Sequence, residues 1–524
     1  MLERIETNHN GHNLGNDTDL IMTGSTSRTL VGDSSYCSND EEFEKRKRNY
    51  CNNNGNEDGF QLNDDELIAH ILGREKEEKK ITRIIDLRMM TLFCIFYFVD
   101  FLDRANIGNA TLAGIQDDLH LSHSELSTAI SAFYITYILF EVPSNIILKR
   151  TSAVMWLSLI MLLWGTMTLV MAFSKNFHSL LACRLLLGAA ESGFIPGILY
   201  MMSKMYRPRE FGLRLALLLC MSSVSGIVSG PIAYGTSFLE GQRGLHGWQY
   251  LFILEGVPTI CLSVVSYFCL FDDIKTVSWL TDTQKALHRE YTNAPNEEVA
   301  LSMRIFLKAI LDWKTFFFSI TYFLTVINLT SYQVFTPTII DGFGFPVLES
   351  QLLSAPPNVV QTISIIIGGY MADKFENKRG ILMVIGFSIG AIGYMLLLIL
   401  QGRWGLYISL FVIPAGLGLQ APSNIGWSAI NFPNLEIRVI AVAVVVMIGN
   451  SGGVVASYLY PLSDGPHYYF GNAFNLCCAV LGALFSGLTS YLLYRQNRKL
   501  DNLRQFDNDF DEKDEHQAQF RYYY

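Results

Sequence analysis

The residues best suited to chemistry are charged side chains inside long apolar segments. The first such segment, residues 89–112, contains Asp100, Asp103 and Arg104. An ionised side chain at the centre of a membrane costs about 2.5–3.5 kcal/mol even on the mildest scale, so these three must be paired or line a cavity. Asp103 and Arg104 project about 100° apart on a helix and need not pair with each other. We expect a proton or substrate site here. The alternative is a charge cluster that locks the helices together.

A second pair of charges lies in residues 178–202. Arg184 and Glu191 are seven residues apart, which is two helical turns, so they share one face of a helix. Arginine stays protonated in such surroundings, whereas burial disfavours the charged form of a carboxyl group. Glu191 could therefore carry a proton in one state and release it in another, as a proton symporter requires. The alternative is a static ion pair between the two residues.

Neutral polar residues replace charges in the second half of the chain. Among them are Asn328, Tyr332 and Asn424. We expect these residues, together with Asn106 in the first half, to be candidate substrate contacts beside the two arginines. Hydrogen bonds between helices are the alternative. Glu255 is a further acid in an apolar segment, for which static pairing is as good an interpretation as proton transfer.

A loop near residue 375 combines an acid with cations, namely Asp373, Lys374 and Arg379. Such a charge clasp can latch neighbouring helices and break when two halves of a transporter rock, so we predict a gating loop. The equivalent loop in the first half keeps its cations but lacks the acid, and Glu141 is a candidate substitute.

The elements that position these residues must be membrane helices. Half of the 524 residues (50%) are apolar and only 17% are charged, whereas about a quarter are charged in a soluble protein. A helix needs about 20 mostly apolar residues to cross a membrane, and twelve stretches qualify. They are residues 89–112, 125–147, 154–173, 178–202, 212–237, 249–271, 312–335, 352–372, 380–400, 404–425, 437–460 and 472–494.

These stretches predict an all-α membrane protein of twelve transmembrane helices in two six-helix halves. The expected domains are a disordered tail (1–85), a first bundle (86–271), a polar central loop (272–311), a second bundle (312–494) and a charged tail (495–524). Lys and Arg gather in alternate loops, and such residues resist translocation. We therefore expect both termini and the central loop in the cytoplasm.

Several classes of function are disfavoured. The net charge of −9 offers no basic footprint for nucleic acid. No P-loop is present, and the nine cysteines match no zinc or haem spacing. We expect no enzyme activity, no metal and no cofactor other than a coupling proton.

Three motifs resemble the signatures of the major facilitator superfamily. They are Gly-x3-Asp-Lys-x4-Arg at 369–379, Arg-x3-Gly at 184–188 and Gly-x3-Gly-Pro at 226–231. This resemblance implies the major facilitator fold.

Other segments resemble the anion:cation symporter family, and within it the fungal allantoate permease group. They are Asp-Arg-Ala-Asn-Ile-Gly at 103–108, Glu-Val-Pro-Ser-Asn at 141–145, the Gly-Trp-Gln-Tyr-Leu-Phe run that begins at 247, and the ending Phe-Arg-Tyr-Tyr-Tyr at 520–524.

The resemblance implies proton-coupled import of a small organic anion across a fungal plasma membrane. It gives Asp103 and Glu191 as proton carriers, and Arg104 and Arg184 as anion contacts or charge balance. Nicotinate ranks first as substrate, followed by allantoate, pantothenate and biotin. We expect a monomer in the lipid bilayer. The alternatives are a nutrient sensor on a transporter fold, a proton-driven exporter, and a vacuolar or other internal membrane.

Overall fold

The computed structural model describes residues 64–292, 303–375, 378–506 and 521–524. These residues form helices and turns, with no strand among them, as the all-α prediction expects. The chain divides into two compact units, Met1–Lys76 and Glu77–Tyr524. The described part of the first unit is the beginning of one helix, and all other described elements belong to the second unit.

The first half of the chain forms ten α-helices and three short π- or 3₁₀-helices in its described part. They are α2 (Asp64–Ile85), η1 (Asp86–Met90), α3 (Thr91–Leu112), α4 (Ile115–Asp118), α5 (His123–Arg150), α6 (Ala153–Met171), α7 (Phe177–Glu191), α8 (Phe194–Met205), α9 (Pro208–Ser237), η2 (Gln242–Gly244), α10 (Gly247–Cys269), η3 (Ile274–Thr276) and α11 (Asp282–Thr292).

The second half continues with long helices and short connecting ones. They are α12 (Met303–Ile310), α13 (Trp313–Gly342), α14 (Val347–Leu353), α15 (Ala355–Lys374), α16 (Arg379–Ile399), α17 (Arg403–Ser409), α18 (Val412–Ile430), α19 (Leu435–Asn450), α20 (Gly452–Ala456), η5 (Leu462–Asp464) and α21 (Tyr469–Phe506).

Eleven helical segments in the described residues are long and apolar enough to cross a membrane. They correspond to eleven of the twelve predicted stretches. The remaining stretch is α3, which has 22 residues but carries Asp100, Asp103 and Arg104 within its apolar sequence. Twelve spans and the side of the membrane on which the termini lie stay predictions.

The predicted tails differ in part from the helices that the structure describes. The tail expected to be disordered lies mostly outside the described residues, but its last part, 64–85, is the helix α2. The last long helix, α21, continues past residue 494 to Phe506. The central loop, expected to be polar, contains the helices α11 and α12.

Polar caps fix where several long helices begin. The hydroxyl of Ser122 accepts the N–H of Glu125 at 3.3 Å, and the Glu125 carboxylate accepts the N–H of Ser122 at 2.8 Å. At the start of α19, the Asn434 side chain accepts the N–H groups of Glu436 and Ile437. These bonds satisfy N–H groups that have no partner within the helix.

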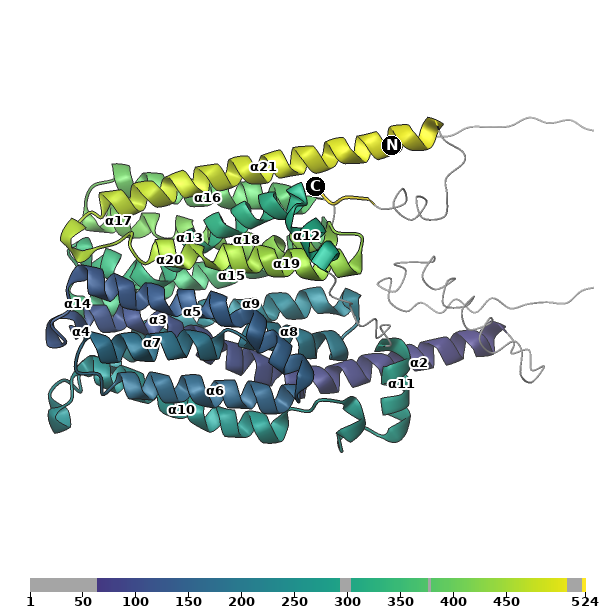
Figure 1. Cartoon of the computed structure of the whole chain (residues 1–524), viewed down its shortest axis with the longest axis horizontal. Helices are drawn as coiled ribbons and strands as arrows, with labels where there is room; N and C mark the ends of the chain where they lie inside the picture. Colours follow the sequence, from purple (N-terminus) through teal and green to yellow (C-terminus); the bar gives the residue numbers. More distant parts are fainter. Residues whose placement is uncertain (1–63, 293–302, 376–377, 507–520) are drawn as a thin grey trace, which may run out of the picture. The chain divides into compact units, whose positions relative to one another are not determined.

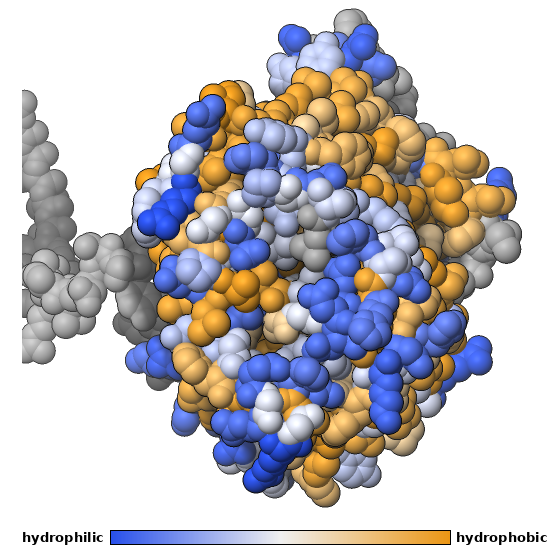
Figure 2. Space-filling model, turned by 90° about the vertical axis from the view of Figure 1, so that its left-hand side faces the viewer, coloured by the Kyte–Doolittle hydropathy of each residue, from blue (hydrophilic) through white to orange (hydrophobic). Residues whose placement is uncertain are grey.

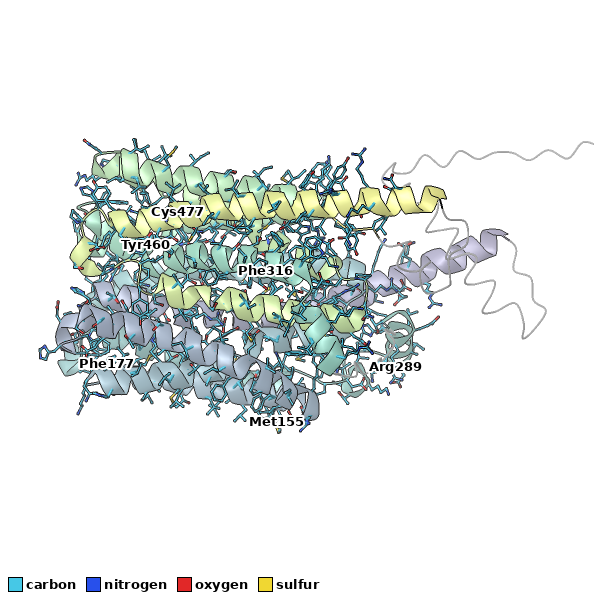
Figure 3. The ribbon with its side chains drawn as sticks, turned by 45° about the horizontal axis from the view of Figure 1, so that its top comes forward. Met155, Phe177, Arg289, Phe316, Tyr460 and Cys477 are labelled. Carbon is cyan, nitrogen blue, oxygen red and sulfur yellow. The ribbon has the colours of Figure 1, made fainter. Side chains whose placement is uncertain are left out.

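The helices of the second unit run alternately up and down in two groups. Figure 1 shows the first-half helices in purple and blue beside the second-half helices in green and yellow. In Figure 3, Phe177 at the start of α7 and Met155 near the start of α6 lie toward opposite ends of the bundle. Across the two groups, α3 packs on α13, α9 on α15, and α5 on α20.

The two ends of the bundle differ in charge. One end, called the basic end below, carries the last turns of α5, α8 and α15, which contain Lys149, Arg150, Lys204 and Lys374. The other, called the opposite end, carries α4, α14 and α17 and is seen face-on in Figure 2. Hydrophilic side chains gather across that face, and hydrophobic side chains lie around it.

Exposed apolar side chains cover the flanks of the helices. Phe316 on α13 is 58% exposed and Met155 on α6 is 47% exposed, and both are labelled in Figure 3. Apolar surface of this extent is typical of helices that face lipid.

The two halves contact each other closely toward the opposite end. Gly108 of α3 lies so near the carbonyl oxygen of Val334 in α13 that a Cβ at position 108 would overlap it. The hydroxyl of Tyr458 lies 3.3 Å from that of Thr128 and 3.2 Å from that of Ser131. This end of the interface is therefore closed.

Candidate functional site

Arg104 of α3 is the centre of a buried charge cluster. Its Nε donates a hydrogen bond to Oε2 of Glu191 at 2.9 Å, and its Nη2 donates to Oδ1 of Asp100, one turn earlier, at 3.2 Å. The rings of Phe101 and Tyr137 each lie 5.0 Å from the guanidinium carbon. Both carboxylates are fully buried, so Arg104 is their positive partner in a medium where a lone charge is costly.

Glu191 lies where the fourth predicted stretch is interrupted. The helix α7 ends at Glu191, and α8 begins at Phe194. Pro196 has no N–H to donate to the carbonyl of Ser192 four residues earlier, which favours a break here. Gly193 in the break contacts the hydroxyl of Ser144 on α5 and leaves no room for a Cβ. Glu191 is thus the last residue of α7, and its carboxyl contacts Arg104 of α3.

Arg184 lies near Arg104 and is not the partner of Glu191. The side chain is 2% exposed, and its Nε and Nη2 have no hydrogen-bond partner among the described residues. The predicted alternative of a static Arg184–Glu191 pair is not seen, because Glu191 bonds to Arg104 instead. Both arginines line one small cavity, whose other lining residues are Ile107, Ile130, Phe133, Tyr134 and Val334.

This cavity lies between the two halves of the chain, since Val334 belongs to α13 and the other lining residues to α3, α5 and α7. In the described conformation its volume is only about 10 Å³, which is room for about one water molecule, so a larger anion requires the cavity to widen.

Asp103 lies apart from the arginines. Its Oδ2 accepts hydrogen bonds from Nε1 of Trp164 at 3.0 Å and from the hydroxyl of Thr259 at 3.3 Å. The carboxyl is fully buried, and both of these partners are neutral. The angular separation of Asp103 and Arg104 expected from the helix is therefore observed.

Two further acids of the first half also have neutral neighbours. Glu255 of α10, 2% exposed, is hydrogen-bonded to the Asn106 amide. Glu141 of α5, 6% exposed, has the Asn450 side chain of α19 beside its carboxyl. Asn106 thus contacts an acid of its own half and does not line the cavity.

The predicted substrate contacts of the second half are buried and are not among the residues that line the cavity. Asn328 donates to the carbonyl of Leu324 at 3.0 Å, and Asn424 donates to the hydroxyl of Thr325 at 2.9 Å. The Tyr332 hydroxyl has no hydrogen-bond partner among the described residues. In this conformation the Asn424 side chain joins α18 to α13.

The predicted gating loop is described in part. The side chain of Asp373 lies outside the described residues. Lys374 holds its ammonium 5.6 Å from the ring centre of Tyr370. One Nη of Arg379 lies against Gly426 of α18, where a Cβ would come within 2.7 Å of it. The cationic part of the loop thus contacts a neighbouring helix, and the clasp with Asp373 stays a prediction.

Sequence reasoning missed the neutral side chains that hold the acids. Trp164 and Thr259 contact Asp103 from α6 and α10, but in the sequence they look like ordinary residues of apolar helices. The spacing of four residues between Asp100 and Arg104 could have predicted their ion pair, since residues four apart are neighbours on a helix.

Two groups of membrane-crossing helices around buried charges define a membrane transporter that works by alternating access. The chain belongs to the Major Facilitator Superfamily, which it matches over residues 93–457. The MFS-type transporter cnsO of Penicillium expansum is 30% identical over 438 residues, which cover 80% of this chain and 84% of that protein. The uncharacterized transporter C1683.12 of Schizosaccharomyces pombe is 33% identical over 433 residues (81% and 88%).

A solved structure shows the same fold. It is a bacterial homolog to the human lysosomal transporter Spinster, in an inward-facing and unoccupied conformation. It aligns with a TM-score of 0.61 and 16% sequence identity, over 77% of this chain and 96% of that one.

Proposed function

We propose that this transporter is a proton-coupled importer of a small organic anion. The observation that carries the proposal is the position of Arg104 and Arg184 on one cavity, with Glu191 bonded to Arg104. Arginine recognises carboxylates through charge-assisted, often bidentate hydrogen bonds. The unpartnered Nε and Nη2 of Arg184 are donors that an anion would satisfy.

Coupling follows from competition for Arg104. While Glu191 is ionised, it occupies the Nε of Arg104. A proton on Glu191 releases that donor to the incoming anion, and loss of the proton returns Arg104 to Glu191 and expels the anion. The proton removes the negative charge of Glu191, and a monovalent anion adds one negative charge. The net charge of the cluster is therefore unchanged, and the cost of an uncompensated charge is avoided.

The charge balance of the first half supports proton binding. Among the described residues of the first half, five carboxyls are buried with exposures of 6% or less, whereas Arg184 is the one arginine buried to that degree and Arg104 is 17% exposed. Asp103, Glu141 and Glu255 form no ion pair with any of the described residues. An unpaired charge in a low-dielectric interior is costly, and a carboxyl group avoids the cost by holding a proton. Asp103 is therefore a second candidate proton carrier.

In the proposed topology α3 also crosses the membrane, which brings the number of spans to twelve. Its charges are paired or hydrogen-bonded inside the bundle, which is how charged residues persist in membranes. The basic end then faces the cytoplasm together with both termini, since cationic loops stay on that side. The closed opposite end faces outward, so the described conformation is closed to the outside.

The resemblance to fungal anion:cation symporters supports the substrate class and a plasma-membrane location. Nicotinate ranks first within that class, and allantoate, pantothenate and biotin follow. Nicotinate has a carboxylate for the arginines and a flat ring that would pack on Phe133 and Tyr134 in a conformation with a wider cavity.

The test is uptake of these four labelled carboxylates by cells that express the chain, at pH 5 and pH 7.5. The proposal expects accumulation of one compound that is stronger at pH 5 and abolished by a protonophore. Net efflux, which lowers the amount of the labelled compound in the cells, would indicate the proton-driven exporter. No flux of any member, with the protein shown at the cell surface, would favour the sensor.

A further inference from the structure

The last residues of the chain are bound at the basic end of the second half. The peptide N–H of Tyr523 donates to Oδ1 of Asn431 at 2.9 Å, and its carbonyl accepts from Nδ2 of the same residue at 3.0 Å. The indole Nε1 of Trp427 donates to that carbonyl at 2.7 Å. Asn431 and Trp427, at the end of α18, are both 0% exposed. A buried asparagine thus holds both backbone groups of one tail residue.

The neighbouring tail residue is held in the same way by another helix. The N–H of Tyr522 donates to Oδ1 of Asn497 on α21 at 2.9 Å, and its carbonyl accepts from Nδ2 at 2.7 Å. Arg521 forms an ion pair with Asp501, one turn further along α21. Two asparagines on two helices therefore hold two consecutive peptide units.

Aromatic and cationic contacts complete the site. The Lys314 ammonium of α13 lies 4.9 Å from the ring centre of Tyr522 and donates to the carbonyl of Asn431 at 3.3 Å. The ring of Tyr524 packs edge-on against Tyr494 of α21, with 5.4 Å between centres. Burial and the nearby Asp312 carboxylate raise the pKa of the Tyr522 hydroxyl, as expected for a ring that is packed into a site.

We infer that this end of the second half is a binding site for an extended peptide with aromatic side chains, and that the C-terminus of the chain occupies it as a strap across α13, α18 and α21. Backbone hydrogen bonds supply the binding, and the rings and Lys314 supply the selectivity, as in other sites for extended peptides. The strap holds the end of α18 beside Gly426, the residue that faces Arg379 of the predicted gating loop. This inference does not depend on the proposed transport activity.

Hydrogen exchange of the full chain, followed by mass spectrometry of its C-terminal peptide, tests the strap. Amides bound to buried side chains should exchange on the order of 100-fold more slowly than in an unstructured peptide. Tyr523→Pro removes the N–H that donates to Asn431 and should abolish this protection. Tyr523→Phe keeps every backbone bond and should preserve it.

A second measurement removes the tail from the chain and supplies it as a separate peptide. A chain that ends at Phe520 should bind a labelled synthetic Phe-Arg-Tyr-Tyr-Tyr peptide, and the full chain should not, because its own tail fills the site. Asn431→Ala in the shortened chain should remove peptide binding. Unprotected amides in the full chain, or equal exchange in the Pro and Phe variants, would overturn the inference. So would failure of the correctly folded shortened chain to bind the peptide.

Discussion

Arg104 of α3 donates a 2.9 Å hydrogen bond to Glu191, the last residue of α7, across the interior of the first half. The bond joins the cation that lines the cavity to a fully buried acid. Any change in the protonation of Glu191 therefore changes what Arg104 can bind.

Glu191→Gln should uncouple transport from the proton gradient. The amide cannot ionise, so Arg104 stays available to the anion in every state. We expect exchange of labelled for unlabelled substrate to persist, while accumulation driven by a pH gradient is lost. Glu349→Gln is the matched control, because Glu349 is exposed at the opposite end. A Glu191→Gln variant that still concentrates substrate would exclude this residue as the coupling acid.

Arg184→Gln should weaken anion binding with little effect on folding, because the Nε and Nη2 of Arg184 have no partner to lose. A hydrogen bond to a charged group is worth about 1.5–3 kcal/mol, which corresponds to a rise in KM of about 10- to 150-fold. The measurement is concentration-dependent uptake, normalised to the protein at the cell surface. Arg243→Gln in an exposed loop should leave KM unchanged. An unchanged KM in Arg184→Gln would remove Arg184 from the site.

Gly108→Ala should open the interface at the opposite end. The added methyl group would overlap the carbonyl of Val334 and push α3 from α13. We expect a cysteine placed at Ser131, beside Tyr458, to react several-fold faster with a membrane-impermeant thiol reagent. Gly235→Ala on α9 is the control, since no atom lies within 4 Å of its added Cβ. Equal labelling in the two variants would show that close packing at Gly108 does not hold this end shut.

The central loop should loosen in acid because of His288 on α11. Burial lowers the pKa of His288 below its usual 6.5, although its Nε2 lies 3.0 Å from the Met205 carbonyl. The unfolded segment then binds more protons than the folded one, so its stability falls as the pH drops through about 6.5.

Hydrogen exchange of α11 at pH 7.5 and 5.5, corrected for intrinsic rates, measures this effect. His288→Gln retains a donor for the Met205 carbonyl and should reduce the pH dependence, whereas exposed His178→Gln should not. An α11 equally protected at both pH values in the unaltered chain would contradict the prediction.

The membrane helices were predictable because the features that mark them, apolar runs and capping residues, each lie within a short stretch of sequence. Apolar runs of sufficient length predicted the eleven described helical segments that could cross a membrane, and residues such as Ser122 and Asn434 mark where helices begin. Only α3 departs from the pattern, because the charged residues that it contributes to the candidate site also make it less apolar.

The partners of the charged residues were harder to predict, since they depend on which helices meet. The sequence placed Arg184 and Glu191 on one face, yet the closer cation to Glu191 is Arg104 from another helix. Trp164 and Thr259 carry no sequence signal of their contact with Asp103. The binding of Tyr523 by Asn431 joins residues 92 positions apart and is equally hidden in the sequence.

Proton uptake on anion binding tests the competition for Arg104 most directly. Purified protein in weakly buffered detergent solution, with a pH indicator, would be mixed with nicotinate or whichever carboxylate the uptake panel identifies. The account predicts that the solution becomes more alkaline as about one proton is taken up for each anion bound, and that Glu191→Gln binds the anion with no pH change. Binding by the unaltered chain with no proton uptake would contradict it.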